Sequence, residues 1–453
     1  MTTEDNEQDS IALALRAGEH LTRGPNELYS LSPRPVPLGP QAGAGADIGR
    51  LIFRRNEATL DLQHNVSRNG MLALGDVTVW MILAFVGVFL FVAYLASYSG
   101  FTWANALGIW GGSAYGAFLF FMALLIIPDL WIRSTAPVRF HRQRREVAFV
   151  VEHPGRKVYL PSPSAHLMYG FWFALFSISG GFVVFSLGFL GGEEELLGVT
   201  GIVWMAITHL VIAPALAIGY VLFYRWARRK AGWRKETVFV PWEDVVAVAT
   251  RNMAVTIGGP AGIGWELHIL PPDPERPGYS LAGAGISANV TSLQMALMQW
   301  ELIRRYMEEG PEAVPERADD YSVTWYKEEM ARQKKRYEQA GKPMGKPFWH
   351  YRLKCWMELG YFASWYTEYR VNHVLPKAAP EGWLAEWSQP LPEDEWATPS
   401  AELTELSRQV EAAYERGETF LDLGPIEQRF GYDDAGETPK AAYPSVPFAA
   451  HQG

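Results

Sequence analysis

Side chains that could bind a metal or act as nucleophiles are present, but their spacing matches no metal or catalytic site. The chain has ten histidines, and His141 and His153 lack the ligand-spaced His, Cys or acidic partners that zinc sites use. Cys355 is the single cysteine, which excludes intramolecular disulfides and cysteine clusters within the chain. We therefore expect no metal, no cofactor and no catalytic residues.

Glycine-rich and acidic stretches also have simpler interpretations than catalysis. Residues 258–264 are rich in glycine but lack the Lys-Ser/Thr of a phosphate-binding loop, so a hairpin loop is the better interpretation. Glu243 and Asp244 are adjacent, and adjacent strand residues point to opposite faces, so they would form a poor acid/base pair. We interpret them as a turn with salt-bridge partners and expect that the protein is not an enzyme.

Two long apolar regions predict how the chain is organised. Residues 77–128 contain no Asp, Glu, Lys or Arg, and a second apolar region covers residues 167–224 with one short acidic break. A bilayer core needs about 20 apolar residues per helix, so we predict two transmembrane hairpins, 77–132 and 166–226. The expected fold class is an α+β membrane protein. In it, four transmembrane helices accompany a small cytoplasmic antiparallel β-barrel or sheet closed by a helix, and a helical C-terminal region.

Two ionisable residues lie in or beside these apolar regions. Ionisable groups inside a bilayer are functional hypotheses by default, because placing them there is unfavourable. His209 could form a structural hydrogen bond to a neighbouring helix, which we favour, or serve a proton or ligand. Asp129 lies four residues before Arg133, so we expect an ion pair at the membrane boundary.

Basic residues flank both apolar regions on one side. The positive-inside rule places that side, and with it both chain termini, in the cytoplasm. We expect these flanks to anchor the protein on anionic lipid, and specific phospholipid recognition is the alternative. The candidate lipid-binding residues are Arg139, Arg142, Arg144, Arg145, Arg225, Arg228, Arg229 and Lys230.

The remaining stretches complete the predicted domain organisation. Short apolar strands and a final amphipathic helix over 291–309 predict that the cytoplasmic β domain is split by the second hairpin. The predicted units are a flexible arm (1–48), a pre-membrane segment (49–76), the hairpin 77–132, a β-hairpin (133–165), the hairpin 166–226, a β domain with its helix (236–310), a helical aromatic-rich module (311–390) and a mostly flexible tail (391–453).

Two resemblances extend this prediction. Val240-Pro-Trp-Glu-Asp244, followed by an apolar strand, and Arg142-x-Arg144-Arg145-x-Val147 are similar to motifs of the pleckstrin-homology-like domains of bacterial membrane proteins. The order of paired spans, the Arg-rich motif, another pair of spans and Val-Pro-Trp-Glu-Asp resembles an uncharacterised proteobacterial family of four-span inner-membrane proteins, often encoded near type VI secretion and toxin genes. That resemblance implies a multi-pass protein of the bacterial inner membrane with an immunity or accessory role.

Aromatic residues in the C-terminal half could form a partner surface. Residues 348–374 form a predicted helix with an apolar stripe of Trp349, Leu353, Trp356, Leu359, Phe362 and Tyr366, which could pack on the core, bind a partner or lie on a membrane. We take Trp242, Trp349, Trp356 and Trp365 as candidate partner-binding residues.

The function that these patterns favour is non-enzymatic binding of a protein partner, a toxin or secretion component, beside contact with membrane lipids. The net charge of −9 argues against nucleic acid as a partner. A lipid- or signal-sensing regulator and a small transporter or pore remain alternatives. The oligomeric state stays open.

Overall fold

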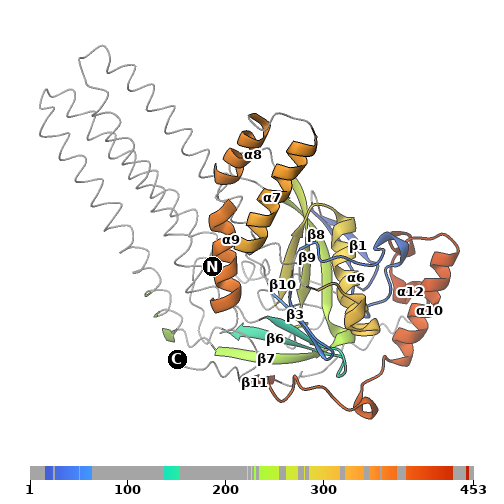
Figure 1. The fold of residues 1–453 in the computed structure, drawn as a ribbon. Coiled ribbons are helices and arrows are strands. Elements are labelled where there is room, and N and C mark those ends of the chain that lie inside the picture. Colours follow the sequence, from blue (N-terminus) through green and yellow to red (C-terminus); the bar gives the residue numbers. More distant parts are fainter. Residues whose placement is uncertain are drawn as a thin grey trace, which may run out of the picture.

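The computed structural model of the protein combines two antiparallel sheets with helices (Figure 1). It describes residues 16–23, 26–49, 51–63, 137–153, 222, 226, 229–230, 234–254, 262–273, 280, 285–316, 322–340, 346–357, 360–374, 384–431 and 445–447.

The first sheet has five strands in the order β1-β2-β8-β9-β10. These are β1 (His20–Arg23), β2 (Asn26–Ser30), β8 (Val246–Ala254), β9 (Gly262–Leu270) and β10 (Ile286–Val290). Alternate residues of a strand point to opposite faces. Ala247 pairs with Ile269 and both are buried in the main core, whereas Val248 on the other face joins a smaller cluster with Val246 and Leu270.

The second sheet has six strands in the order β11-β7-β6-β5-β4-β3. These are β3 (Ile52–Arg55), β4 (Thr59–Leu62), β5 (Val138–His141), β6 (Glu146–His153), β7 (Arg234–Pro241) and β11 (Ser445–Pro447). Leu62 of β4 pairs with Val138 of β5, and His153 of β6 pairs with Arg234 of β7. Neighbouring strands of this sheet therefore come from distant parts of the sequence.

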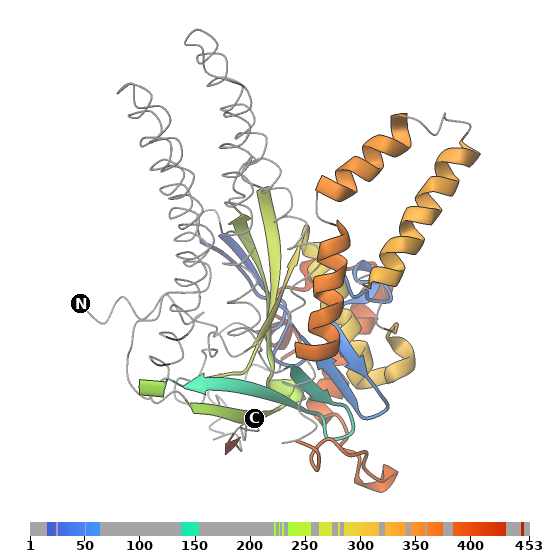
Figure 2. The same ribbon diagram turned by 60° about the vertical axis from the view of Figure 1, so that its left-hand side comes forward.

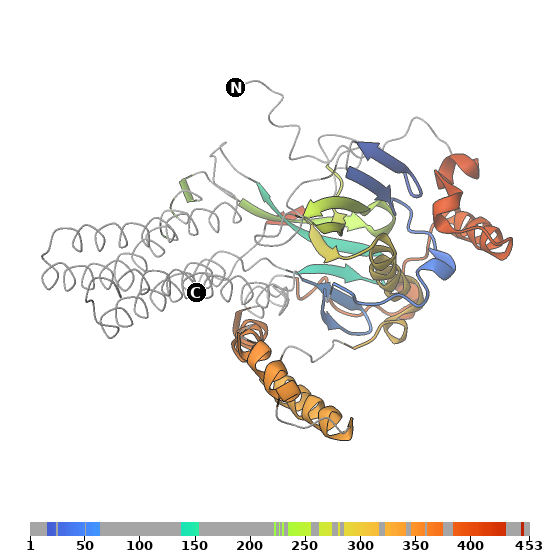
Figure 3. The ribbon, with the colours of Figure 1, turned by 90° about the horizontal axis from the view of Figure 1, so that it is seen from above.

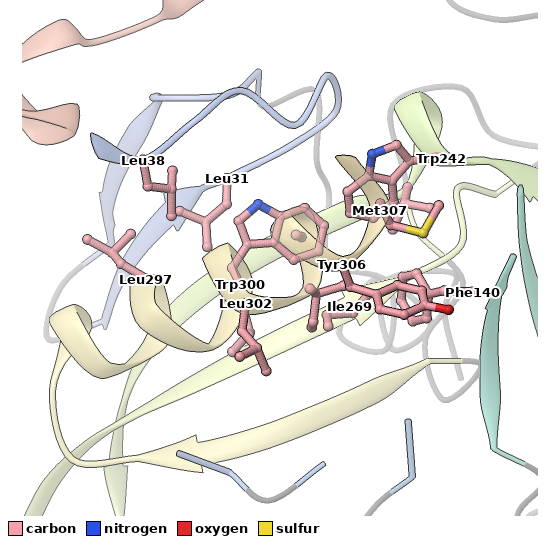
Figure 4. Close-up of a cluster of buried hydrophobic side chains, with 14 of the residues drawn as sticks. Leu31, Leu38, Phe140, Trp242, Ile269, Leu297, Trp300, Leu302, Tyr306 and Met307 are labelled. Atoms are coloured by element: carbon pink, nitrogen blue, oxygen red, sulfur yellow. The ribbon is translucent and has the colours of Figure 1, made fainter. Parts of the chain in front are cut away.

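Helix α6 (Leu293–Glu309) packs between the sheets and organises the core. It begins at Ser292, whose hydroxyl accepts the Met295 N–H, and it ends at Gly310, whose φ of 104° is reached easily by glycine. The rings of Trp300 and Tyr306 are fully buried. Figure 4 shows both beside Trp242 and Phe140, which come from the adjoining strands and turn.

The N-terminal stretch takes part in this core, in contrast to the flexible arm predicted for residues 1–48. Leu31 and Leu38 are fully buried, and β1 and β2 extend the first sheet. At Gly45, which has a φ of 75°, a Cβ atom would lie 2.6 Å from the Leu302 backbone nitrogen, so the chain crosses α6 at very close range. Prolines and glycines here shape a packed connection, although composition alone suggests a mobile one.

The C-terminal half contributes two groups of helices. Helices α7 (Val323–Gln339), α8 (Lys346–Met357) and α9 (Gly360–Tyr369), with a π-helical turn (Arg370–Val374), form an arm that projects from the sheets (Figures 2 and 3). Helices α10 (Ala401–Glu415), α11 (Phe420–Leu423) and α12 (Ile426–Arg429) return to the body. Leu406 and Val410 of α10 are buried in the main core, so much of the tail predicted over 391–453 is packed structure.

The predicted four-span membrane fold requires correction. None of the helices in the described ranges is long and apolar enough to cross a membrane. The longest, α6 and α7, have 17 residues each and include several charged side chains, whereas a span needs about 20 apolar residues. The described architecture is an α+β arrangement of two sheets and helices, larger than the small barrel that was predicted.

The predicted localisation, a multi-pass protein of the bacterial inner membrane with cytoplasmic termini, is contradicted by the same finding. It was inferred from the hairpins 77–132 and 166–226, of which only residues 222 and 226 fall in the described part of the chain. Part of the basic flank that supported it is buried, since the side chains of Arg139 and Arg145 are 4% and 8% exposed. Those two arginines are structural residues, so the charge-based orientation argument fails for them.

Candidate functional site

The arm is held together by contacts between α7 and the two helices that follow it. Ser322 caps α7 through its hydroxyl, which accepts the Trp325 N–H at 3.0 Å. The Glu368 carboxylate of α9 accepts the Val323 N–H at 2.9 Å, a favourable place for a negative charge at a helix N-terminus. Tyr326 of α7 packs edge-on against Tyr361 of α9. These contacts fix which face of α9 lies against α7.

One side of α9 and the π-helical turn carries a row of rings that we call the aromatic stripe: Tyr361, which also packs on Tyr326 of α7, and then Trp365, Tyr369 and His373. Residues four apart lie on one side of a helix. Trp365 and Tyr369 stack with ring centroids 6.1 Å apart, and Tyr369 and His373 stack at 5.0 Å. Tyr361 is 52% exposed, Trp365 48% and Tyr369 40%. The stripe is therefore an ordered aromatic surface open to solvent.

The inward face of the same helix has smaller or more polar residues. Ser364, Thr367 and Val371 are buried, and Tyr366 is only 2% exposed. A helix that packs on a core usually directs its most apolar side chains inward. Helix α9 inverts this pattern in part, because it buries Ser364 and Thr367 beside Tyr366 and exposes Trp365 and Tyr369. This inversion marks the stripe as a surface with a purpose other than internal packing.

Helix α8 adds two further exposed apolar side chains to the arm. Trp349 is 63% exposed and Leu353 is 43% exposed, and they lie one helical turn apart. The Arg352 guanidinium lies 5.9 Å from the centre of the Trp349 ring, in a cation–π contact. Tryptophan, tyrosine and arginine are the residue types most enriched at binding hot spots. The arm thus presents that composition on two consecutive helices.

The arm departs from the single helix predicted over 348–374. Helix α8 ends at Met357 and α9 begins at Gly360, where a Cβ atom would lie 3.0 Å from the Tyr326 ring and 3.1 Å from the Cys355 carbonyl. The predicted stripe is consequently divided: Trp349 and Leu353 are exposed, whereas Tyr366 is buried. The side chains of Trp356 and Phe362, and all of Leu359, lie outside the described residues.

Sequence reasoning identified Trp349 and Trp365 but missed Tyr361, Tyr369 and His373. The spacing of four residues from Tyr361 to His373 is visible in the sequence. The apolar stripe predicted over 348–374 runs along another face of the helix, the face expected to pack inward, and so does not include these three residues.

Trp242, a predicted partner-binding residue, is a core residue. It is fully buried against Phe140 and Trp300, with ring centroids 5.9 and 5.2 Å away. Its indole N–H donates to Glu308 at 3.0 Å, and Arg145 donates to the same carboxylate at 2.8 and 2.9 Å. Trp242 therefore fixes the junction of the sheets and cannot contact a partner.

The basic strip predicted to contact lipid is covered by residues 384–397, which we call the strap. Arg139 forms a two-point ion pair with Asp61, at 2.5 and 2.6 Å, and donates to the Ser388 hydroxyl of the strap. Arg144 donates to the Trp387 carbonyl at 3.2 Å, and the Arg142 guanidinium lies over the Trp396 ring. These arginines contact the chain itself, and Arg139 is buried by those contacts, whereas Arg142 and Arg144 are partly buried.

Of the remaining candidate residues, the structure describes Arg229 and Lys230. Arg225, Arg228, His209 and Asp129 lie outside the described residues. Arg229 and Lys230 are described and exposed, and the Lys230 ammonium lies 5.4 Å from the centre of the Trp226 ring. Nothing in this geometry assigns a ligand to them.

His141 is a buried structural histidine in the second sheet. Its Nε2 lies 3.2 Å from the Gln389 carbonyl, and its Nδ1 accepts the Arg144 N–H at 3.4 Å. A neutral ring protonated at Nε2 satisfies both contacts. Burial lowers the pKa of His141 to about 4, aided by Arg144 and Arg139, so the ring stays neutral at pH 7.

A second histidine, His268, lies beside polar groups on the outer face of the first sheet. Its Nε2 is 3.0 Å from the Thr250 hydroxyl and 3.7 Å from the Glu266 carboxylate. Burial lowers the pKa of His268, and Glu266 opposes that effect. Both contacts engage one ring nitrogen, whereas a nucleophile–base–acid relay needs the carboxylate on the opposite nitrogen. The arrangement is therefore not that of a catalytic triad.

The described residues contain no group of three His, Cys, Asp or Glu side chains that could hold a metal ion. The exposure and stacking of the aromatic stripe, together with the exposed Trp349 and Leu353, make this surface the candidate site that the geometry favours. Comparison with protein families, with curated proteins and with solved structures finds no match to this chain.

Proposed function

We propose that this protein is a non-enzymatic binding protein whose arm docks onto another protein through the aromatic stripe and the exposed Trp349 and Leu353. The observation that carries the proposal is the inversion of α9, which exposes Trp365 and Tyr369 while it buries Ser364 and Thr367. Large rings held in stacked rows lose little conformational entropy on binding and bury much apolar area. A surface of this kind supports protein recognition.

The stacked geometry supports a preformed site. Glu368 and Ser322 fix the start of α7, and Tyr361 packs on Tyr326, so α9 has its orientation before any partner arrives. Preorganised binding surfaces avoid part of the ordering entropy of association. The resemblance to a toxin-associated family names one concrete partner, a toxin or secretion component, which stays a prediction.

Site-specific photo-crosslinking in the native host tests the proposal. A photoreactive amino acid replaces Trp365 in the full chain, and a matched control replaces Leu421, which is 40% exposed on α11. We expect a discrete protein adduct from position 365 and none from position 421. Identical adducts from both positions, or none from position 365, would contradict docking through the stripe.

Affinity measurements with the captured protein then test the stripe directly. The double substitution Trp365→Ala/Tyr369→Ala should raise the dissociation constant about 30-fold, as expected when a hot spot loses about 2 kcal/mol of binding free energy. Leu421→Ala should leave it unchanged. Equal affinity of the double variant and the wild type would show that the stripe is not the binding surface.

A further inference from the structure

The arm differs from the rest of the chain in charge. Between residues 323 and 374 the sequence has ten lysines and arginines and five glutamates, a net charge of +5, although the whole chain has a net charge of −9. The excess comes from α7 and α8, whose net charges are +2 and +3, and both helices pack against α9, which carries the aromatic stripe.

Two carboxylates of the arm are already engaged. Glu368 accepts the Val323 N–H, and Glu329 accepts from Arg332 at 2.9 Å and from Gln333 at 2.5 Å. Lys334 and Lys335 are exposed on α7 and form no salt bridge within the described ranges. The positive charge of the arm is thus only partly neutralised inside the protein.

We propose that the partner of the arm is an acidic protein surface, in which carboxylates surround an apolar patch. This proposal rests on the proposed function, and it adds the chemistry of the partner. The apolar patch would cover the stripe, and the carboxylates would meet Lys334, Lys335 and Arg352. Complementary charges raise the association rate and reject partners of the wrong sign.

The ring geometry favours protein over nucleic acid as that partner. Single-stranded nucleic acid binds aromatic side chains by stacking bases on free ring faces. In the stripe, Trp365, Tyr369 and His373 stack on one another, so the facing sides of these rings are occupied. Exposed ring edges and hydroxyl groups remain, which suit the side chains and backbone of a protein.

Fluorescently labelled peptides test the charge preference with the full chain. The probes are a peptide of alternating glutamate and leucine, the same peptide with lysine in place of glutamate, and oligo-deoxythymidine. We expect the glutamate peptide alone to bind, less tightly as salt concentration rises. Lys334→Glu/Lys335→Glu should weaken its binding about tenfold, whereas Lys334→Arg/Lys335→Arg should retain it.

The outcomes separate this inference from the proposed function. Equal binding of the glutamate and lysine peptides, lost in Trp365→Ala/Tyr369→Ala, would overturn the acidic partner and leave the docking surface intact. Binding of the glutamate peptide that is unchanged in that double variant would reject the stripe itself. Tighter binding of oligo-deoxythymidine, or no binding of any probe, would also overturn the inference.

Discussion

Helices α6 and α9 contain the same kinds of aromatic residues but place them in opposite environments. In α6, Trp300 and Tyr306 are fully buried between the sheets. In α9, Trp365 and Tyr369 form a solvent-exposed stack. Helical periodicity groups residues on one face, but it does not say whether that face points inward. The contrast teaches that the surroundings of a helix, rather than its pattern, decide the role of its rings.

Helix α6 is covered by other parts of the chain on two sides. Strands lie against one side, and the N-terminal stretch crosses the other, where the Ala46 N–H donates to the Met298 carbonyl and the Gly49 N–H donates to Gln299. Helix α9 contacts α7 through Tyr361 and Glu368, whereas Trp365 and Tyr369 of the stripe stay exposed. Four measurements test the contrast between buried and exposed rings.

The largest expected effect belongs to the core of α6. Trp300→Ala should lower the free energy of unfolding by about 3–5 kcal/mol, because it removes a buried ring and leaves a cavity. Urea denaturation of the full chain measures the loss. A loss below about 1 kcal/mol would mean that α6 does not organise the core.

The next effect distinguishes the buried His141 from the exposed His373. Folding lowers the pKa of His141 from an ordinary value of 6.5 to about 4, so the unfolded state binds more protons between these two pH values. Stability should therefore fall as the pH drops from 7 to 4, by about 3 kcal/mol from this residue.

Denaturation at several pH values checks this effect. His141→Gln should flatten the pH dependence, and the matched control His373→Gln should not. His268 contributes in the same direction in all three proteins, because burial also lowers its pKa. An unchanged pH dependence in His141→Gln would show that the buried ring is not the source.

A smaller effect is expected at the base of the arm. Ser322→Ala removes the hydroxyl that caps α7 and should cost about 1 kcal/mol of local stability. Amide hydrogen exchange should become faster in α7 and α9 but stay unchanged in α6. Equal acceleration in α6 would mean that the arm and the body unfold as one cooperative unit.

The smallest effect on stability is expected in the stripe. Trp365→Ala should change the free energy of unfolding by no more than about 0.5 kcal/mol, since an exposed side chain stabilises the fold little. Urea denaturation beside Trp300→Ala gives the direct comparison. A loss near that of Trp300→Ala would make Trp365 a structural residue and remove the argument for docking.

Local patterns in the sequence predicted several elements well. The predicted strands 147–151, 237–240 and 265–270 fall within β6, β7 and β9, and the helix predicted over 291–309 matches α6 closely. Alternation and helical spacing are short-range properties, so a single stretch of chain is enough to reveal them.

Long-range features were not predictable in this way. Arg139 and Asp61 are 78 positions apart, and neither has a sequence pattern that names the other. Arg139 was therefore assigned to a basic surface, and Trp242 to an exposed aromatic one. The orientation of α9 likewise depends on contacts with Tyr326 and Val323 of α7. Helical spacing alone therefore predicted an apolar stripe on a different face of α9 from the exposed aromatic stripe.

The pairing of β4 with β5 and of β6 with β7 has a geometric consequence. Leu62 lies opposite Val138 and His153 lies opposite Arg234, so the chain leaves and re-enters the second sheet between adjacent strands in both cases. Because β5 and β6 are antiparallel, both exits share one end of the sheet. A short turn that joins Leu62 to Val138, or His153 to Arg234, should therefore preserve the strand register of the sheet.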